Sequence, residues 1–281
     1  MRELLVSFRK IMTSCGFWLC VGMTVVLLFT TAIYEDTTTF DRYSVIRALT
    51  DLTAEERTLH YELCRTVVMM NVRSSWFTMF VPIITAFCFV PRMCAERDSN
   101  AVRFQVFRSS KLKFNAVQFV SGTVAAGTAV LIGYVLFCGA VHLLFPAPSE
   151  YGGWNAEMIA SYGFSFPKLL LEIGLYGMFW SIPAMFCTSV MRNKYLIMCI
   201  PFFAKYGLTQ AVQMVQQNAV VDYENVNTGL LNFAITVNPD GLLTIAYRPD
   251  FKAPALFFGI TAAMFAAAYL VIGQNRRDCG A

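Results

Sequence analysis

The chain contains 281 residues, of which 57% are hydrophobic and 14% charged, and its formal net charge is +4. Soluble proteins carry about 25% charged residues. The apolar residues are concentrated in runs without Asp, Glu, Lys or Arg, at 11–34, 74–91, 114–149, 173–191 and 253–275. Because about 20 apolar residues suffice for a helix to cross a bilayer, these runs exclude a soluble enzyme, a secreted disulfide scaffold and a disordered chain. They predict an integral membrane protein.

The residues before the first apolar run form two unlike faces of a helix. Leu4, Leu5, Phe8, Ile11 and Met12 lie on one face, and Arg2, Glu3, Arg9 and Lys10 lie on the other. This pattern predicts an amphipathic helix along the inner membrane surface or, alternatively, the cytoplasmic start of the first span. The run that follows is too long for a signal peptide and lacks a small-residue cleavage site, so we expect it to be retained as a span.

The whole chain is predicted to form a single all-α transmembrane domain, residues 1–281, with six spans. We place these spans at about 13–34, 74–92, 115–145, 169–191, 195–215 and 254–274. Lys205 interrupts the apolar sequence of the fifth span. Between the last two spans, segment 216–253 is fairly apolar but contains several Asn residues, Pro239, Asp240 and Gly241. This composition favours short re-entrant or interfacial helices over a seventh span.

The distribution of basic residues predicts the orientation. Loops on the side of both termini carry 13 Lys and Arg residues, and loops on the other side carry 8. Cytoplasmic loops are enriched in Lys and Arg, so both termini are expected in the cytoplasm, with anionic lipid near the basic residues. The net charge follows from this bias and gives no reason to expect a nucleic acid partner.

The outer segment, 35–73, is longer than a simple connection between spans. Thr53 followed by Glu56 predicts a capping box that opens a helix. Apolar residues then recur along one side of that helix, at Leu59, Leu63, Val67 and Met70. Glu56 and His60 are spaced to share a metal ion, but the chain has only two histidines and no third ligand in view. We therefore interpret these residues as a surface ion pair or cap.

Three ionisable residues lie at or inside the ends of the expected spans. Glu172 and His142 are close to span ends, so we expect their side chains to extend to the membrane surface. Lys205 lies deeper, and it is the candidate for a polar residue that faces the interior, on a transport pathway. The nine cysteines contain no Cys-x-x-Cys pair, and we interpret them as small apolar residues within helices.

Small residues recur every four positions in the third and sixth spans. Such a stripe lets helix backbones approach closely, within one subunit or across a dimer. The two stripes consist of Ser121, Ala125, Ala129 and Gly133, and of Gly259, Ala263 and Ala267.

The connection between the second and third spans, 92–113, is too long for a plain turn, and basic and acidic residues dominate its first half. Phe104, Val106 and Phe107 give it apolar anchors. It is therefore expected either to present a defined surface to a cytoplasmic partner or to be a solvated connector.

In this layout the chain resembles the permease subunit of type-2 ATP-binding-cassette (ABC) exporters. That family has an amphipathic elbow, six spans, a cytoplasmic coupling helix after the second span and short re-entrant helices between the fifth and sixth. An acidic residue leaves the second span and a Ser-Arg element precedes the third. Glu96 and Ser110-Lys111 occupy similar places here, whereas Asn100 and Arg108 depart from the family pattern.

The resemblance implies a subunit of the bacterial plasma membrane that dimerises with an identical or a different permease subunit. A separate cytoplasmic ABC ATPase would bind ATP and Mg²⁺, so this chain needs no cofactor, and it lacks a phosphate-binding loop of its own. The residues expected to couple to the ATPase are Glu96, Arg97, Asp98, Asn100, Arg103 and Arg108. The Phe-rich spans suggest an amphipathic or lipophilic substrate, such as a peptide or a drug-like molecule.

Two other functions stay open. One is a non-transporting membrane partner, such as an immunity or assembly factor. The other is a membrane-embedded enzyme that uses Glu55, Glu56 and His60 as acid, base or ligand. A neighbouring gene for a protein with a phosphate-binding loop would favour the exporter over the enzyme.

Overall fold

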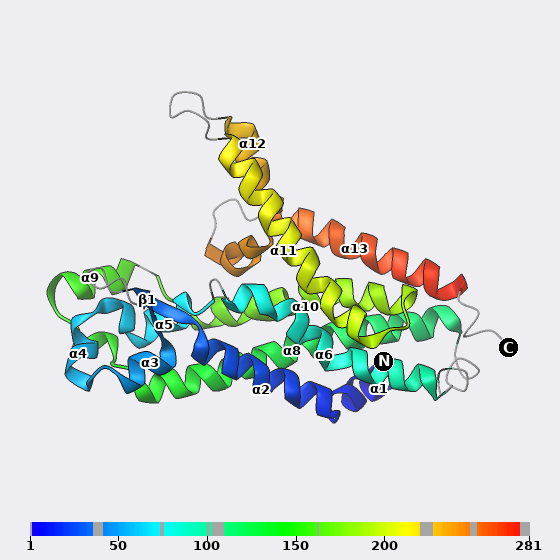
Figure 1. Cartoon of the computed structure of the whole chain (residues 1–281), viewed down its shortest axis with the longest axis horizontal. Coiled ribbons are helices and arrows are strands. Elements are labelled where there is room, and N and C mark those ends of the chain that lie inside the picture. Colours follow the sequence, from blue (N-terminus) through cyan, green and yellow to red (C-terminus); the bar gives the residue numbers. More distant parts are fainter. Residues whose placement is uncertain are drawn as a thin grey trace.

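The computed structural model describes residues 2–35, 42–73, 76–99, 102, 110–161, 163–219, 227–247 and 252–275. Helices dominate it (Figure 1). Five of those described are long and apolar enough to cross a membrane: α6 (Trp76–Asp98), α8 (Lys111–Leu144), α10 (Phe166–Val190), α11 (Lys194–Ala219) and α13 (Lys252–Asn275). The chain is therefore a multi-pass membrane protein, as the apolar runs indicate.

The first expected span, 13–34, differs from the prediction. Helix α2 (Cys15–Thr30) has only 16 residues, and Ala32–Glu35 form the strand β1. The preceding α1 (Arg2–Met12) meets α2 at an angle of 57°, and only the bent pair together has the length and composition of a span. Ser14 produces the bend through two hydrogen bonds of its hydroxyl. The hydroxyl donates to Ile11 O (2.6 Å) at the end of α1, and it accepts from Phe17 N (3.3 Å), so that Ser14 caps the start of α2.

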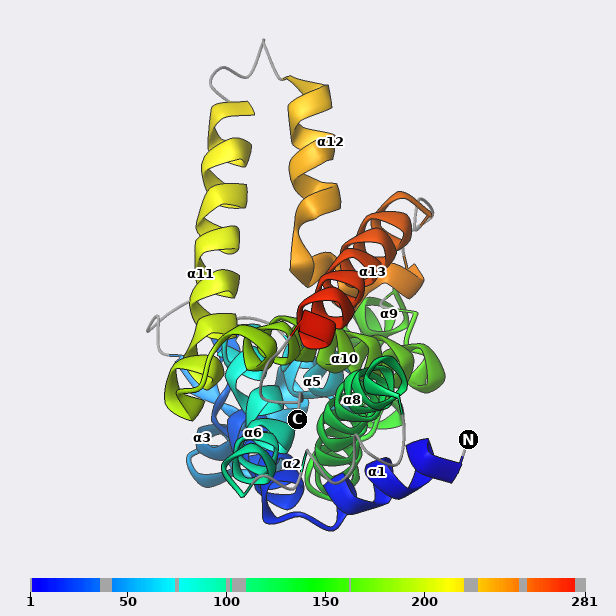
Figure 2. The same ribbon diagram turned by 90° about the vertical axis from the view of Figure 1, so that its right-hand side faces the viewer.

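Helices α2, α6, α8 and α10 lie side by side and form the core (Figures 1 and 2). Glycine permits the closest approaches, because a Cβ on Gly127 of α8 would lie 2.4 Å from Met178 Cγ and 2.9 Å from Gly174 O of α10. A Cβ on Gly133 would lie 2.8 Å from Thr24 Cβ of α2. The backbones of these neighbouring helices are thus in direct contact, as is usual in membrane proteins.

The two stripes of small residues have different surroundings. Ser121, Ala125 and Ala129 are fully buried, so the stripe on α8 packs within the subunit. On α13 the stripe formed by Gly259, Ala263 and Ala267 is exposed, and a Cβ on Gly259 would meet nothing within 4 Å. The second stripe therefore does not pack against the described part of the chain.

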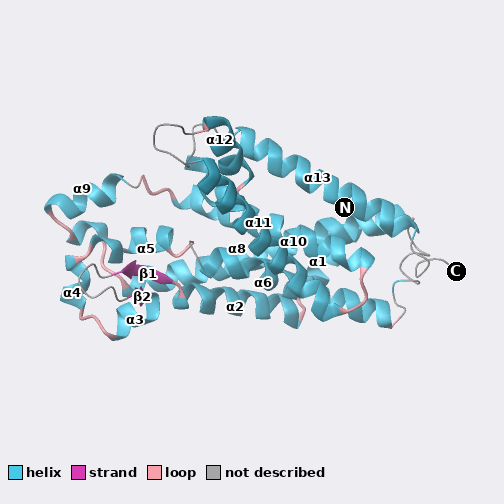
Figure 3. Cartoon of the chain, turned by 45° about the horizontal axis from the view of Figure 1, so that its top comes forward, coloured by secondary structure: helices cyan, strands magenta, loops and turns pink. Residues whose placement is uncertain are grey.

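The outer segment forms one strand and several short helices rather than a single long helix. They are β2 (Arg42–Ser44), α3 (Val45–Thr50), α4 (Ala54–Leu59), the 3₁₀ helix η1 (Tyr61–Leu63) and α5 (Arg65–Asn71). Strand β2 pairs antiparallel with β1 (Figure 3). The chain leaves helical geometry at His60 and again at Cys64, so Leu59 is exposed while Leu63 and Val67 are buried. The expected continuous apolar side is therefore wrong, although the capping box is confirmed.

A second outer segment packs against the first and completes a cap on one end of the bundle. It contains η2 (Pro148–Glu150) and α9 (Gly153–Ser161). Tyr151 donates a hydrogen bond to Arg57 O (3.0 Å), and burial raises the pKa of its phenol. The guanidinium of Arg57 donates to Leu144 O (2.9 Å) at the end of α8. In Figure 1 this cap lies at the left, and α1 and the end of α13 lie toward the right.

The capping box of α4 predicts a local acid transition. The Thr53 N–H (2.7 Å) and hydroxyl (2.8 Å) both donate to Glu56 Oε2 and lower the pKa of this carboxyl from its ordinary value of 4.5. The cap therefore stabilises α4 fully above pH 4.5, and this stabilisation is lost as the pH falls through the lower pKa of the folded state. We expect backbone amides of Ala54–Leu59 to exchange faster, relative to their intrinsic rates, in acid. A Glu56→Gln variant should lose this pH dependence, whereas Glu55→Gln should keep it.

Segment 227–247 contains short helices, α12 (Thr228–Val237) and the 3₁₀ helix η3 (Pro239–Tyr247), and not a seventh span. Helices α11 and α12 stand side by side and lean away from the core (Figure 2). The 3₁₀ helix η3 returns to the bundle, where it packs against α10. The chain then continues into α13, which lies across α10 and α8.

Candidate functional site

The candidate functional site is a network of largely buried charged and polar side chains that extends from the cap end of the bundle toward its middle. Glu172, Tyr176 and Trp180 lie on successive turns of one face of α10. Tyr176 is about 15 Å from the start of α10, near the cap, and Lys205 is about 16 Å from the start of α11, at the opposite end. The hydrocarbon core of a bilayer is about 30 Å thick, so Tyr176 and Lys205 lie near its middle, whereas Glu172 lies closer to the end of α10 at the cap.

One half of the network is an ion pair between Arg73 and Glu172. Arg73 follows α5, and its Nη1 lies 2.6 Å from Glu172 Oε2. The side chains are 7% and 0% exposed. The same nitrogen donates to Leu243 O of η3 (2.7 Å), and Arg73 Nε donates to Met70 O (3.3 Å). The expectation that Glu172 extends to the membrane surface is wrong, because the nearby arginine compensates its charge inside the protein.

The other half of the network joins α11 to η3. The Lys205 ammonium forms an ion pair with Asp240 Oδ1 and lies 5.8 Å from the ring centroid of Trp180. The Tyr176 hydroxyl lies 3.0 Å from Thr78 O and 3.2 Å from the same Asp240 oxygen. Lys205 thus faces the interior, with 3% of its side chain exposed, and a role in a transport pathway stays a prediction.

The network anchors η3 to three other parts of the chain. Leu243 of η3 accepts a hydrogen bond from Arg73, and Asp240 of η3 contacts Tyr176 of α10 and Lys205 of α11. Each positive charge has a negative partner, which is the condition for burying charge at this depth. Sequence reasoning selected Lys205 but missed Arg73, Tyr176 and Asp240. The sequence did contain a signal for such partners, because Glu172 and Lys205 each interrupt an apolar run and so require a partner of opposite charge.

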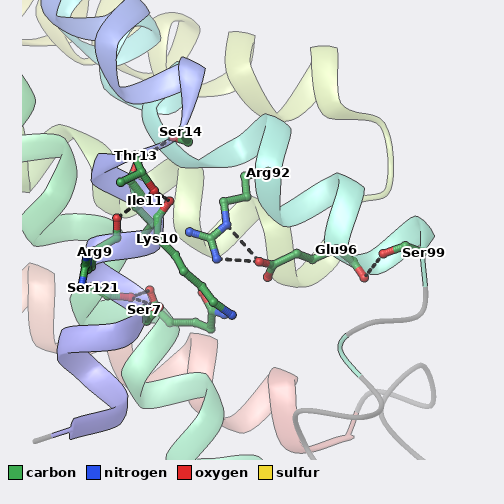
Figure 4. Close-up of polar contacts among 11 residues, drawn as sticks. Ser7, Arg9, Lys10, Ile11, Thr13, Ser14, Arg92, Glu96, Ser99 and Ser121 are labelled. Atoms are coloured by element: carbon green, nitrogen blue, oxygen red, sulfur yellow. Dashed lines mark hydrogen bonds and ion pairs between the residues drawn. The ribbon is translucent and has the colours of Figure 1, made fainter.

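Three of the expected coupling residues, Glu96, Arg97 and Asp98, lie at the other end of α6, opposite the cap. Arg92 to Asp98 form the last two turns of α6, so the connecting loop begins later than expected. Glu96 accepts from Arg92 Nε (2.9 Å) and Nη2 (2.6 Å) on the same helix (Figure 4). Arg97 donates to Met191 O (2.8 Å) and Thr188 O (3.2 Å).

Two consequences follow for the coupling surface. Arg97 caps the last carbonyls of α10, so it fixes α6 to α10 and is not a freely available surface group. Asp98 is exposed at the end of α6 and is available to a partner. Asn100, Arg103 and Arg108 lie outside the described residues.

Helix α1 is attached to α8 at this same end. The hydroxyls of Ser7 and Ser121 lie 2.9 Å apart (Figure 4), and Lys113 Nζ lies 2.9 Å from Glu3 Oε1. Ile11 is buried, whereas Leu5 is 62% exposed. The apolar side of α1 is thus divided between the bundle and the surroundings.

The residues considered for an enzymatic or metal site are not gathered together. Glu56 is bound to Thr53, and the ring of His60 lies 4.8 Å from that of Tyr34. Among the described residues no group of three His, Cys, Asp or Glu side chains is placed to hold a metal ion.

Comparisons with known proteins add no assignment: no family model, no curated protein and no solved structure matches this chain. The functional interpretation therefore depends on the buried network, on the end of α6 opposite the cap and on the layout of the helices along the chain.

Proposed function

We propose that this chain is the transmembrane subunit of an ATP-driven exporter of the ABC type, which moves an amphipathic or lipophilic substrate out of the cell. The observation that carries the proposal is the charged network of Arg73, Glu172, Lys205 and Asp240 among the helices of the bundle. Ionisable groups are expensive inside a membrane, and where they occur they mark substrate or ion pathways.

The position of η3 supports a transport role for the network. This short helix lies between α12 and α13 in the chain, and it is held by side chains from other elements rather than by a continuous helix. Non-helical or short helical backbone at membrane depth is characteristic of transport proteins, where it lines the substrate route. Breaking the Arg73 and Lys205 contacts would free η3 and open that route.

The contact between α6 and α10 provides the mechanical connection to an ATPase. Arg97 holds the end of α6 against the end of α10, and α10 carries Trp180, Tyr176 and Glu172 further along the same helix. A force applied to the end of α6 would therefore act on α10 and on the network. ATP binding by the partner would favour one arrangement of the spans over the other.

The remaining parts of the proposal follow from this assignment. The chain would lie in the bacterial plasma membrane with both termini in the cytoplasm, α1 and α2 together would provide a sixth crossing, and α1 would be the elbow helix. A second permease subunit, identical or different, would complete the pathway. ATP and Mg²⁺ would bind to the separate ATPase subunit.

A charge reversal at the end of α6 tests the coupling. Asp98→Lys is expected to lower co-purification with the candidate cytoplasmic ATPase, and the ATP turnover of the complex, by about tenfold, because it reverses a charge in the proposed interface. Glu55→Lys is the matched control, since it makes the same change on an exposed residue of the cap. If both variants retain the ATPase equally well, the assignment of the coupling surface is wrong.

A further inference from the structure

We infer that Asp240 binds the cationic group of an amphipathic substrate, at the point where η3 meets α10 and α11. The inference rests on the proposed transport function and adds to it the sign of the substrate charge. It depends on which of the charges in the network remains accessible.

The two partners of the Lys205–Asp240 pair differ in accessibility. The lysine side chain is 3% exposed, whereas the aspartate side chain is 34% exposed. Lys205 and Tyr176 both contact the same oxygen of the carboxylate, Oδ1. Within the described residues no hydrogen bond or ion pair reaches Oδ2. The charge that a ligand can reach is therefore negative.

The carboxylate is also held in place. Its backbone N–H donates to Asn238 Oδ1 (3.1 Å), and Lys205 and Tyr176 both hold the side chain at Oδ1. A substrate ammonium can approach Oδ2 without breaking these contacts. An anionic group could reach Lys205 only after displacing Asp240, which would strand the aspartate without its partner.

Trp180, whose ring centroid lies 5.8 Å from the Lys205 ammonium, is the aromatic side chain beside the ion pair, and a series of ring contacts continues from it to α13. Trp180 packs against Phe179 with ring centroids 5.6 Å apart, and Phe179 packs against Phe258 of α13 at 5.0 Å. Phe257 contacts Phe258 at 5.4 Å, and both Phe179 and Phe257 are partly exposed. Aromatic faces attract cations and provide apolar contact area. The combination of one accessible carboxylate with partly exposed rings fits a lipophilic cation.

Two probes of the same shape and opposite charge test this inference. Tetraphenylphosphonium is a lipophilic cation, and tetraphenylborate is its anionic counterpart. Binding of each to the purified full chain in lipid nanodiscs would be measured by equilibrium dialysis, with empty nanodiscs as the background. We expect specific binding of the cation and none of the anion.

Variants at the pair make the test specific. Lys205→Met removes the competing internal cation, so tetraphenylphosphonium should bind about tenfold more tightly or better. The double variant Lys205→Met with Asp240→Asn leaves no stranded charge, and it should lose the specific binding. Elution from a size-exclusion column as for the unmodified chain would show that both variants are folded.

The inference is overturned if the double variant binds the cation as the unmodified chain does, if tetraphenylborate binds as tightly, or if Lys205→Met weakens cation binding. The proposed function fails separately. If Asp240-dependent cation binding is found but Asp98→Lys leaves ATPase association unchanged, the binding site stands and the coupling surface does not. If instead Asp98→Lys lowers ATPase association but cation binding does not depend on Asp240, the coupling surface stands and the binding site does not.

Discussion

Replacing Arg73 by Met is expected to lower the free energy of unfolding by about 3–5 kcal/mol, because it removes the positive charge that compensates the fully buried Glu172 carboxylate. The same change removes the hydrogen bond to Leu243 O, so η3 would also lose an anchor. Equilibrium unfolding in mixed detergent micelles, titrated with a denaturing detergent, would measure the effect.

Two controls separate the buried pair from ordinary charge effects. Arg42→Met removes the arginine of an exposed pair with Glu35, whose side chains are 74% and 50% exposed, and it should cost about 0–1 kcal/mol. Adding Glu172→Leu to Arg73→Met removes the buried negative charge as well and should recover most of the lost stability. An Arg73→Met variant as stable as Arg42→Met would contradict the buried ion pair.

Adding one methyl group at Gly127 is expected to destabilise the protein by about 1–3 kcal/mol, because the helices there have no room for it. A Cβ at this position would lie 2.4 Å from Met178 Cγ and 2.9 Å from Gly174 O. The side chain of Met178 can move, but the backbone of α10 cannot move without separating α8 from α10 along their length. The unfolding titration described above would measure the loss for Gly127→Ala.

Gly139→Ala provides the matched control on the same helix. A Cβ on Gly139 would meet nothing within 4 Å, so the substitution should be neutral or slightly stabilising, since alanine has the higher helix propensity. Equal effects at the two positions would show that α8 and α10 do not approach as closely as the structure places them.

The membrane class and most spans could be predicted from the sequence, because the requirement to bury about 20 apolar residues is local. The ends of α8, α10, α11 and α13 lie within a few residues of the expected ranges. The first span is the exception, since the backbone bends at Ser14 and enters a strand pair at Ala32. The partner of that strand, β2, begins at Arg42, beyond the apolar run, and left no signal in it.

The pairing within the network could not be predicted, because it joins residues far apart in the chain. Arg73 and Glu172 are 99 positions apart, and Lys205 and Asp240 are 35 apart. Glu172 lies close enough to a span end for its side chain to extend to the surface, and the position of Arg73 favours the interior instead. The role of Arg97 was hidden for the same reason, since its acceptors belong to α10.

The amino-acid sequence alone determined that this protein crosses the membrane several times, that a capping box opens α4 and that short helices separate the last two spans. These features depend on residues near one another in the chain, through hydrogen bonds within a turn and the length of an apolar run. The tertiary structure decided which charges neutralise one another, which stripe of small residues is buried and which carboxylate remains accessible. Those outcomes depend on distances between helices, because the energy of a buried charge is set by the partner within a few ångströms of it.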